Sequence, residues 1–453
     1  MNHPWAQEAI FYHIYPLGLT VAPQRNDFAA APVARLEQLY PWLDQIQSLG
    51  ANALYLGPLF ESSAHGYDTA DYYRVDRRLG SNETLAAFAR ELHRRGLRLV
   101  LDGVFNHVGR DFWAFRDVQA NGQHSPYAGW FSGLDFNRRS PYGDHFSYQG
   151  WAGNYDLVHL DGAHPDVQRH LLDAVTTWVE QFGIDGLRLD AADQLSDGFL
   201  DALGAHCRAL RSDFWLMGEI VFGDYQRLLA PVRCDSATNY ECYKGLYSSL
   251  NDQNYHEIAY AVRRQFGAGG IYQGKALFNF ADNHDVDRVA SRLKDASQLY
   301  PLYALLFSMP GIPSIYYGSE WGLSGARTAH SDAALRPALD LAQAAQNAPQ
   351  PALPAALRRL ADVRKASPAL QRGDYREVHV SPQQFAFLRS LPGEEVLVVL
   401  NAADTPAALE LSLPFQNARL TDLLNPGEEF AMQNSTAAVT VPPNWARVLA
   451  VTG

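Results

Sequence analysis

Charged side chains and histidines follow four short apolar runs of this sequence. The runs end in LDGVFNH, LRLDAAD, MGEI and FADNHD, which contain Asp102, Asn106, His107, Arg188, Asp190, Glu219, His284 and Asp285. One isolated acid at such a point is commonly a helix cap or a turn residue. Four charged run ends in one chain indicate a functional site, because burying charge without a partner is costly and would not recur without a use.

The spacing of Arg188 and Asp190 predicts a pair. In a strand the two side chains project from the same face, about 6–7 Å apart. A permanently charged guanidinium beside Asp190 favours the ionised carboxylate. Glu219 instead follows FWLMG, an apolar approach with no adjacent cation. Desolvation and nearby negative charge favour its protonated form.

One ionised and one protonated carboxyl group are what retaining glycoside hydrolysis needs, about 5–5.5 Å apart. We therefore expect Asp190 to be the nucleophile and Glu219 the general acid. Asp285 is suited to holding sugar hydroxyls and helping to distort the ring. His107 and His284 are suited to donating hydrogen bonds to hydroxyls of the same ring.

Alternating elements are expected to position these groups. Strand-like runs occur at 9–18, 51–59, 97–105, 183–190, 213–220, 276–285 and 311–318, with a further one at 236–241, and helix-like runs at 33–50, 82–96 and 166–183. The second of these helices is expected to start at the cap Asn82. This alternation predicts a parallel sheet, and eight units would close a (β/α)8 barrel. Catalytic groups of such barrels lie at the carboxyl ends of the strands.

Two regions interrupt the alternation. Residues 107–156 are rich in Gly, Asn and aromatic residues without a convincing helix, which predicts a small domain inserted after the third strand. After about residue 370 the sequence turns to short alternating runs, typical of an antiparallel β-sandwich. The predicted domains are a barrel of residues 1–106 and 157–370, an insertion at 107–156 and a C-terminal domain at 371–453.

Composition narrows the class of protein. The 453 residues are 47% hydrophobic and 19% charged, a globular balance, and the net charge of −12 argues against a nucleic-acid partner. No long apolar run predicts a membrane helix. The N-terminal residues lack a signal-peptide pattern, so a cytoplasmic protein is expected. Three cysteines without metal-site spacing are expected to be inert thiols.

The segments DGVFNH, GLRLDAAD, GEI and FADNHD resemble, in order, the four signature segments of the α-amylase family of glycoside hydrolases. The resemblance extends over the barrel, the insertion and the β-rich tail. It implies that Asp190 is the nucleophile, Glu219 the general acid/base and Asp285 the aspartate that stabilises the transition state. It also implies that Arg188, His107 and His284 lie at the subsite of the cleaved sugar. Tyr67, in HGYDTADYY, matches the family tyrosine that stacks on that sugar.

Two departures from the family pattern bear on substrate and metal. Starch-degrading members commonly carry a Lys-His pair that grips the sugar beyond the cut, where this chain has Asp193 and Gln194. The segment YDLVHLD departs from the calcium-binding pattern. It leaves Asn106 and Asp161, too few oxygen ligands for a cation that takes 6–8. We therefore expect no required cofactor and assign no metal ligand, with structural calcium the less favoured alternative.

The expected activity is retaining hydrolysis of mainly α-1,4 bonds in malto-oligosaccharides or cyclic dextrins. The altered segments resemble the oligosaccharide-processing cyclomaltodextrinase branch, although no extra N-terminal β-domain of that branch is expected. Bulky rings of the insertion, among them Trp113, Trp130, Phe131 and Trp151, are expected to wall a bounded substrate pocket. Two alternatives stay open on the same site: a transglycosylase, or an α-1,6-acting hydrolase of cyclic or branched oligosaccharides such as cyclic maltosyl-maltose. A non-catalytic sugar-binding protein is the distant alternative. The oligomeric state is left open.

Overall fold

The computed structural model describes residues 5–452 and contains one parallel eight-stranded sheet. Its order is β11-β10-β9-β5-β2-β1-β13-β12. The bounds are Phe11–Ile14 (β1), Ala53–Leu56 (β2), Arg98–Gly103 (β5), Gly186–Leu189 (β9), Trp215–Gly218 (β10), Ser236–Ala237 (β11), Phe278–Phe280 (β12) and Ile312–Tyr316 (β13). A bridge between Thr238 and Phe278 links the segment after β11 to β12. The (β/α)8 prediction is confirmed, with β11 as the eighth strand.

The chain divides into two compact units, residues 14–44 with 53–237, and residues 5–13 with 45–52 and 238–452. We call them the Asp190 unit and the Asp285 unit. The α-helices of the described residues are α1 (Pro16–Leu19), α2 (Tyr40–Ser48), α3 (Asn82–Arg94), α4 (Trp113–Asn121), α5 (Pro165–Phe182), α6 (Asp197–Leu210), α7 (Tyr240–Asn251), α8 (His256–Phe266), α9 (Val289–Arg292), α10 (Leu299–Ser308), α11 (Leu341–Gln346), α12 (Leu353–Ala366) and α13 (Pro368–Arg372). The predicted boundaries of the insertion and of the C-terminal domain stay predictions.

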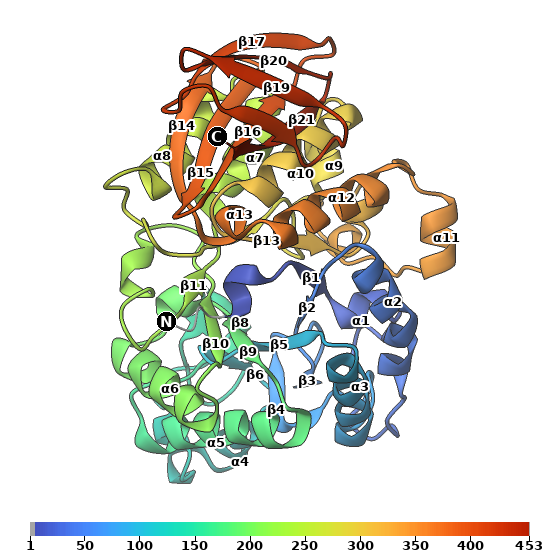
Figure 1. Cartoon of the computed structure of the whole chain (residues 1–453). Coiled ribbons are helices and arrows are strands. Elements are labelled where there is room, and N and C mark those ends of the chain that lie inside the picture. The colour runs from blue at the N-terminus through green and yellow to red at the C-terminus, as the bar shows by residue number, and fades with distance from the viewer. Residues whose placement is uncertain (1–4, 453) are drawn as a thin grey trace. The chain divides into compact units, whose positions relative to one another are not determined.

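In the Asp190 unit, α3, α5 and α6 lie side by side (Figure 1). The expected cap of α3 is wrong by one residue. Ser81 is the N-cap and forms a capping box with Thr84, whereas the Asn82 side chain accepts a bond from the backbone N–H of Val75 at 2.9 Å. Helix α5 ends at Gly183, whose φ of 64° is readily adopted by glycine.

The segment after β5 forms a small three-stranded sheet, β6 (His107–Gly109), β8 (Asn154–His159) and β7 (Gly150–Trp151), in that order. The expectation of no helix there is wrong, since α4 spans nine residues. Its helical pattern is weak in the sequence because Phe112 caps it without a side-chain hydrogen bond and only Ala114, Phe115 and Val118 are buried. Tyr67 lies in the turn between the paired strands β3 (Phe60–Ser62) and β4 (Thr69–Val75).

The expected aromatic wall is only partly supported. Trp130 and Phe131 are buried, and the Phe131 ring packs edge-on against Phe115 of α4, at 5.1 Å between centroids. They belong to the core of this small sheet and helix. Trp113 is 39% exposed and Trp151 is half-buried. Of the four rings, only those of Trp113 and Trp151 are exposed enough to contact a ligand.

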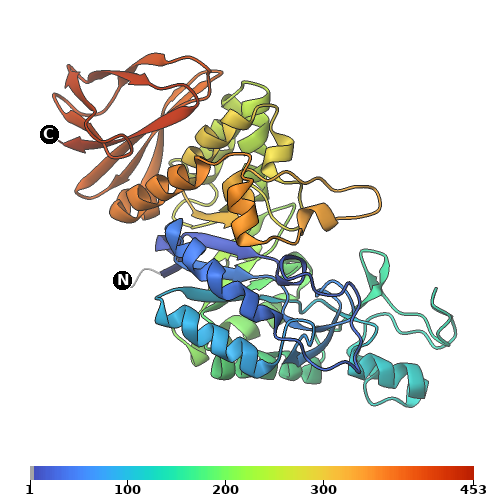
Figure 2. The same cartoon turned by 90° about the vertical axis from the view of Figure 1, so that its right-hand side faces the viewer.

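In the Asp285 unit the C-terminal strands form one antiparallel sheet, shown curling over its core in Figure 2. Its order is β14 (Asp374–Val380), β15 (Gln384–Leu391), β16 (Glu394–Asn401), β21 (Trp445–Thr452), β18 (Arg419–Asp422), β19 (Glu429–Gln433), β20 (Thr436–Val441) and β17 (Ala407–Ser412). Strand β20 alternates exposed and buried residues, as one solvated face requires. The predicted all-β C-terminal fold is confirmed.

Helix α10, LYPLYALLFS, carries almost no polar side chains and is buried at nine of its ten positions. A helix that is apolar all round must be covered on all sides. Within the Asp285 unit it contacts α7 and α12 on one side and β16 and β21 on another. The C-terminal strands therefore bury part of the helical layer.

The three cysteines, Cys207, Cys234 and Cys242, are buried and form no disulfide, as expected. No helix among residues 5–452 is long and apolar enough to cross a membrane.

Candidate active site

Arg188 is the centre of a buried charge cluster in the Asp190 unit. It is 2% exposed, and its guanidinium reaches three carboxylates. Nη1 lies 2.8 Å from both Asp102 Oδ1 and Asp190 Oδ1, and Nη2 lies 2.5 Å from Glu219 Oε1. The strand register explains this, because Arg188 of β9 pairs with Asp102 of β5 on one side and with Met217 of β10 on the other. The predicted pairing of Arg188 with Asp190 is confirmed.

The environment predicted for Glu219 is wrong in one respect. No cation was expected beside it, yet it is ion-paired with Arg188. The partner is distant in sequence and reaches Glu219 from the neighbouring strand, so the apolar run before Glu219 does not reveal it. The second oxygen, Oε2, accepts a bond from the Ala191 N–H at 3.2 Å. Ala191 has φ 44° and ψ 45°, a left-handed conformation that is costly for a residue with a Cβ.

Two tyrosines complete the cluster through Asp102. Tyr55 and Tyr67 both donate hydrogen bonds to Asp102 Oδ2, at 2.8 and 2.9 Å. Burial raises the pKa of Tyr55 well above 10, so this hydroxyl stays a donor. The Tyr67 ring centroid lies 5.8 Å from the Arg188 guanidinium carbon. The sequence interpretation missed Tyr55, and its only signal was an inward position on β2.

His107 contributes a buried polar atom beside the nucleophile candidate. The residue is 1% exposed, and its Nε2 lies 3.9 Å from Asp190 Oδ2. Among the described residues Nε2 has no hydrogen-bond partner. Burial, with smaller contributions from His65 and His159, lowers the pKa of His107 to about 3, so the ring is neutral near pH 7. The Trp151 ring lies 5.3 Å away. A ligand hydroxyl would satisfy this nitrogen.

The Asp285 unit holds the other predicted pair. His284 Nε2 lies 2.9 Å from Asp285 Oδ2, in the loop that follows β12. Arg336 Nη2 lies 3.0 Å from Asp285 Oδ1, and Arg327 donates to the Asp285 carbonyl at 3.0 Å. Neither arginine was singled out from the sequence, because both lie in a segment of irregular structure between β13 and α11.

The remaining predicted residues lie at the surface or in local turns. Asp193 and Gln194 are exposed, and the Gln194 amide donates to Asp193 Oδ2 at 2.8 Å. Asp161 accepts a local bond from the Ala163 N–H, and the Asn106 amide lies 3.4 Å from His107 Nδ1. Within residues 5–452 no group of three or more His, Cys, Asp or Glu could hold a metal ion.

Two models of known protein families match this chain. Residues 35–351 match the model described as the alpha amylase catalytic domain, and residues 375–447 match the maltogenic amylase C-terminal domain. The chain belongs to the α-amylase family. The predicted resemblance is confirmed, and this α-amylase-family protein is a glycoside hydrolase.

Relatives of this α-amylase-family enzyme include a cyclomaltodextrinase of Geobacillus thermopakistaniensis, 29% identical over 97% of this chain and 76% of the relative. Neopullulanase 2 of Thermoactinomyces vulgaris is 31% identical over 98% of this chain and 78% of the relative. A solved structure of the cyclic α-maltosyl-(1→6)-maltose hydrolase of Arthrobacter globiformis superposes with a TM-score of 0.81. It shares 28% identity and covers 99% of this chain and 100% of its own. A debranching enzyme of Nostoc punctiforme gives a TM-score of 0.82 at 29% identity, over 98% of each chain.

Proposed function

We propose that this enzyme cleaves α-glucosidic bonds, mainly α-1,4, in short malto-oligosaccharides or cyclic dextrins by the retaining route. In this proposal Asp190 is the nucleophile and Glu219 the general acid/base. The observation that carries it is the contact of one guanidinium, that of Arg188, with both carboxylates. Two carboxylates that contact the same guanidinium lie close together. The retaining route requires such proximity, with a separation of about 5–5.5 Å between the two carboxyl groups.

The electrostatics of the cluster support the role of Asp190. A nucleophilic carboxylate has to stay ionised, and a buried guanidinium at 2.8 Å favours that state. Asp102 shares the same nitrogen and is fixed by Tyr55 and Tyr67, so it holds the guanidinium in place. The unpartnered Nε2 of His107 is placed to donate to a hydroxyl of the sugar that Asp190 attacks.

Glu219 has to deliver a proton to the leaving oxygen. Its oxygens contact Arg188 and the Ala191 N–H, both donors. A protonated carboxyl group keeps one acceptor oxygen, so one of these two contacts has to loosen when the bound sugar brings the glycosidic oxygen to Glu219. The left-handed Ala191 orients that N–H toward Glu219 directly after the nucleophile.

We assign Asp285 to holding hydroxyls of the reacting sugar and helping its ring to distort. His284 and Arg336 each contact one of its two oxygens, so the carboxylate is oriented before substrate arrives. Preorganised charge of this kind stabilises a transition state without reorganisation during the reaction. We infer a cytoplasmic location, supported by an intracellular maltogenic amylase of Bacillus subtilis, 31% identical over 71% of this chain and 56% of that relative.

A second candidate is α-1,6-bond hydrolysis in a cyclic or branched oligosaccharide. It is favoured by the likeness to the Arthrobacter hydrolase over the full length of both chains. Transglycosylation on the same site is the third outcome, because water and a second sugar compete for the glycosyl-enzyme. A purely sugar-binding role is disfavoured by the presence of Asp190, Glu219 and Asp285 together.

Product analysis tests the proposal. The enzyme is incubated with maltotriose, β-cyclodextrin, pullulan, starch and a cyclic maltosyl-maltose, and products are followed by chromatography and proton NMR. We expect α-anomeric products and a kcat/KM for short or cyclic substrates at least about tenfold above that for starch. Comparable rates on starch, measured per reducing end, would overturn the substrate class. A β-anomeric first product would overturn the retaining route.

A further inference from the structure

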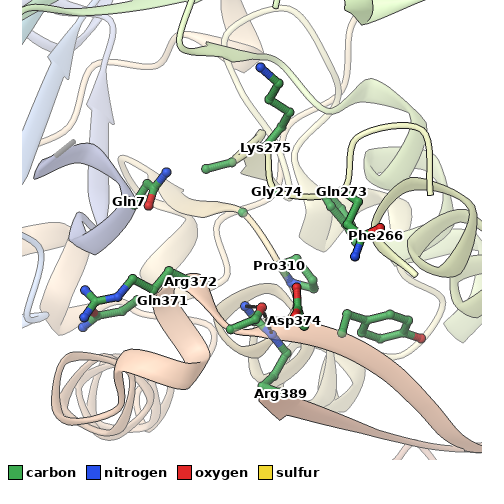
Figure 3. A pocket seen from close by; sticks show the side chains of 14 residues that line it. Gln7, Phe266, Gln273, Gly274, Lys275, Pro310, Gln371, Arg372, Asp374 and Arg389 are labelled. Atoms are coloured by element: carbon green, nitrogen blue, oxygen red, sulfur yellow. Dashed lines mark hydrogen bonds between the residues drawn. The ribbon is translucent and has the colours of Figure 1, made fainter. Parts of the chain in front are cut away.

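The Asp285 unit contains a pocket whose residues have no part in the catalytic proposal (Figure 3). It lies where β12 and β13 begin, because Lys275 precedes β12 and Gly311 precedes β13. Asp285 follows the other end of β12, so this pocket is at the opposite end of the strand. The cavity volume is about 60 Å³, room for a group several times the size of a water molecule.

Arg389 of β15 lines this pocket although it is only 1% exposed. Figure 3 shows its guanidinium pointing from the strand toward the pocket. Nη1 donates to the carbonyls of Ser308 and Leu370 at 2.7 and 2.9 Å. Nη2 and Nε both donate to the Gly373 carbonyl, at 2.9 and 3.3 Å. A guanidinium has five N–H donors, so these four bonds leave one N–H of Nη2 unused.

A second buried cation lies beside the first. Arg364 of α12 is 0% exposed, and its Nη1 donates to the same Leu370 carbonyl at 3.0 Å. Its other bonds run to the carbonyls of Phe307 and Gly311, at 2.9 and 2.6 Å. Its Nε has no hydrogen-bond partner in the described chain. In the same residues no carboxylate forms an ion pair with either arginine. The two guanidinium groups are therefore stabilised mainly by carbonyl dipoles, with a smaller coulombic contribution from Asp374 to Arg389.

This arrangement is electrostatically costly. Burial lowers the pKa of Arg364 to about 9, and burial together with repulsion from Arg364 lowers the pKa of Arg389 to about 9. Two neighbouring buried cations without an ion-paired carboxylate are rare, because each loses its hydration and they repel. An anion at Arg389 would offset both penalties.

The rim of the pocket is also cationic. Lys275 and Arg372 line it, although Arg372 already forms an ion pair with Glu8 at 3.0 Å. The one carboxylate in the described lining is Asp374, which is exposed and forms no ion pair with Arg389. The negative charge of Asp374 would repel an anion, but the lining also contains three cationic side chains, those of Lys275, Arg372 and Arg389. The amides of Gln7 and Gln371 add hydrogen-bond donors.

We propose that this pocket binds a small tetrahedral oxyanion, either free phosphate or the phosphoryl group of a sugar phosphate. Arg389 would hold the anion from the floor, and Arg372 and Lys275 from the rim. The remaining N–H of Arg389 can give the anion one charge-assisted hydrogen bond, and the cavity volume fits a group of this size. The proposal is independent of the catalytic assignment.

Phosphorus NMR and thermal melting with inorganic phosphate, at constant ionic strength, test the proposal. We expect the wild type to broaden the phosphate line and to melt at a higher temperature with phosphate than with chloride. The rim variant Lys275→Gln/Arg372→Gln should bind phosphate at least about tenfold more weakly, with kcat on oligosaccharides unchanged. The control Arg74→Gln/Arg138→Gln removes two charges from side chains that are 70% and 78% exposed, and should bind as the wild type does.

Arg389→Lys keeps the charge, but a lysine has three N–H donors, which the carbonyls of Ser308, Leu370 and Gly373 would occupy. This variant should therefore bind phosphate more weakly than the wild type. If Arg389→Lys fails to fold, the comparison of phosphate binding between the rim variant and the wild type tests the proposal by itself. A glucose phosphate ester that binds at least about tenfold more tightly than inorganic phosphate, and that loses this advantage in the rim variant, would assign the pocket to a sugar phosphate. Equal binding would assign it to free phosphate. The proposal is overturned if the wild type does not broaden the phosphate line, or if the rim variant and wild type bind phosphate equally well.

Discussion

Arg336 holds Asp285 from two directions: its Nη2 lies 3.0 Å from Asp285 Oδ1, and its Nε donates to the adjoining His284 carbonyl at 3.1 Å. The same nitrogen, Nη2, also lies 2.9 Å from Asp332 Oδ2. The arginine is 11% exposed by side chain, whereas the Asp285 side chain is 35% exposed. Arg336 is thus a largely buried side chain that leaves part of the Asp285 carboxylate open, which makes it a positioning residue for Asp285.

Arg336→Ala should lower kcat by about 10–100-fold with a smaller change in KM, because Asp285 loses the contact that orients it for the transition state. Arg336→Lys should recover only part of this loss, since a lysine cannot make the Nε and Nη2 bonds together. Steady-state kinetics on maltotriose measure both. Arg292→Ala, which removes a more exposed arginine of this unit, is the control. Equal losses in the control and in Arg336→Ala would contradict the positioning role.

Asp190→Asn should abolish turnover by several orders of magnitude, because an amide is not a nucleophile. Arg188 keeps Asp102 and Glu219 as partners, so the fold should persist. Initial rates together with far-ultraviolet circular dichroism check this expectation. Activity within about tenfold of the wild type would exclude Asp190 as the nucleophile.

Glu219→Gln should be nearly inactive on natural oligosaccharides but should regain part of the first step on a glycosyl fluoride. A fluoride leaving group needs little protonation, so the missing acid matters less. The amide can still accept from the Ala191 N–H, which preserves the local geometry. The measurement is the ratio of kcat/KM on the two substrates. An equal loss on both would contradict the acid role.

Glu320 predicts a pH dependence of stability in the Asp285 unit. It is fully buried, accepts hydrogen bonds from Tyr12 Oη at 2.6 Å and from the Gly318 N–H at 2.7 Å, and burial raises its pKa from 4.5 to about 7. Between these values the folded state binds more protons than the unfolded state, so this group makes stability fall as pH rises from about 4.5 to about 7. Glu320→Gln removes that dependence.

Relative to the wild type, Glu320→Gln should therefore gain up to about 3 kcal/mol of unfolding free energy as pH rises through this window. Urea unfolding at about pH 5 and about pH 8 measures the change. Glu410→Gln, at an exposed position of β17, should show no such trend. A constant difference between Glu320→Gln and wild type at both values would mean that Glu320 is ionised throughout.

The sequence predicts the elements of this molecule better than the partners of their side chains. The alternation of apolar runs is local, and it located the barrel strands and the C-terminal sheet. The pairing of Arg188 with Asp190 followed from the two-residue repeat of a strand. The Arg188–Glu219 contact, the Tyr55 hydroxyl and the Arg336–Asp285 contact depend on strand register and on a loop distant in sequence, which no local pattern encodes. Helix α4 was missed because it has only three buried positions and its N-cap, Phe112, makes no side-chain hydrogen bond.

Helix α10 has a consequence for any shortened form of the chain. Its buried surface is completed by β16 and β21, near the end of the sequence. During synthesis this apolar helix is made before β16 and β21, so the surface that these two strands cover stays exposed until both have been made. The C-terminal sheet is thus required to cover the helical layer. An enzyme truncated before these strands would leave apolar surface of α10 exposed to solvent and would be prone to aggregate.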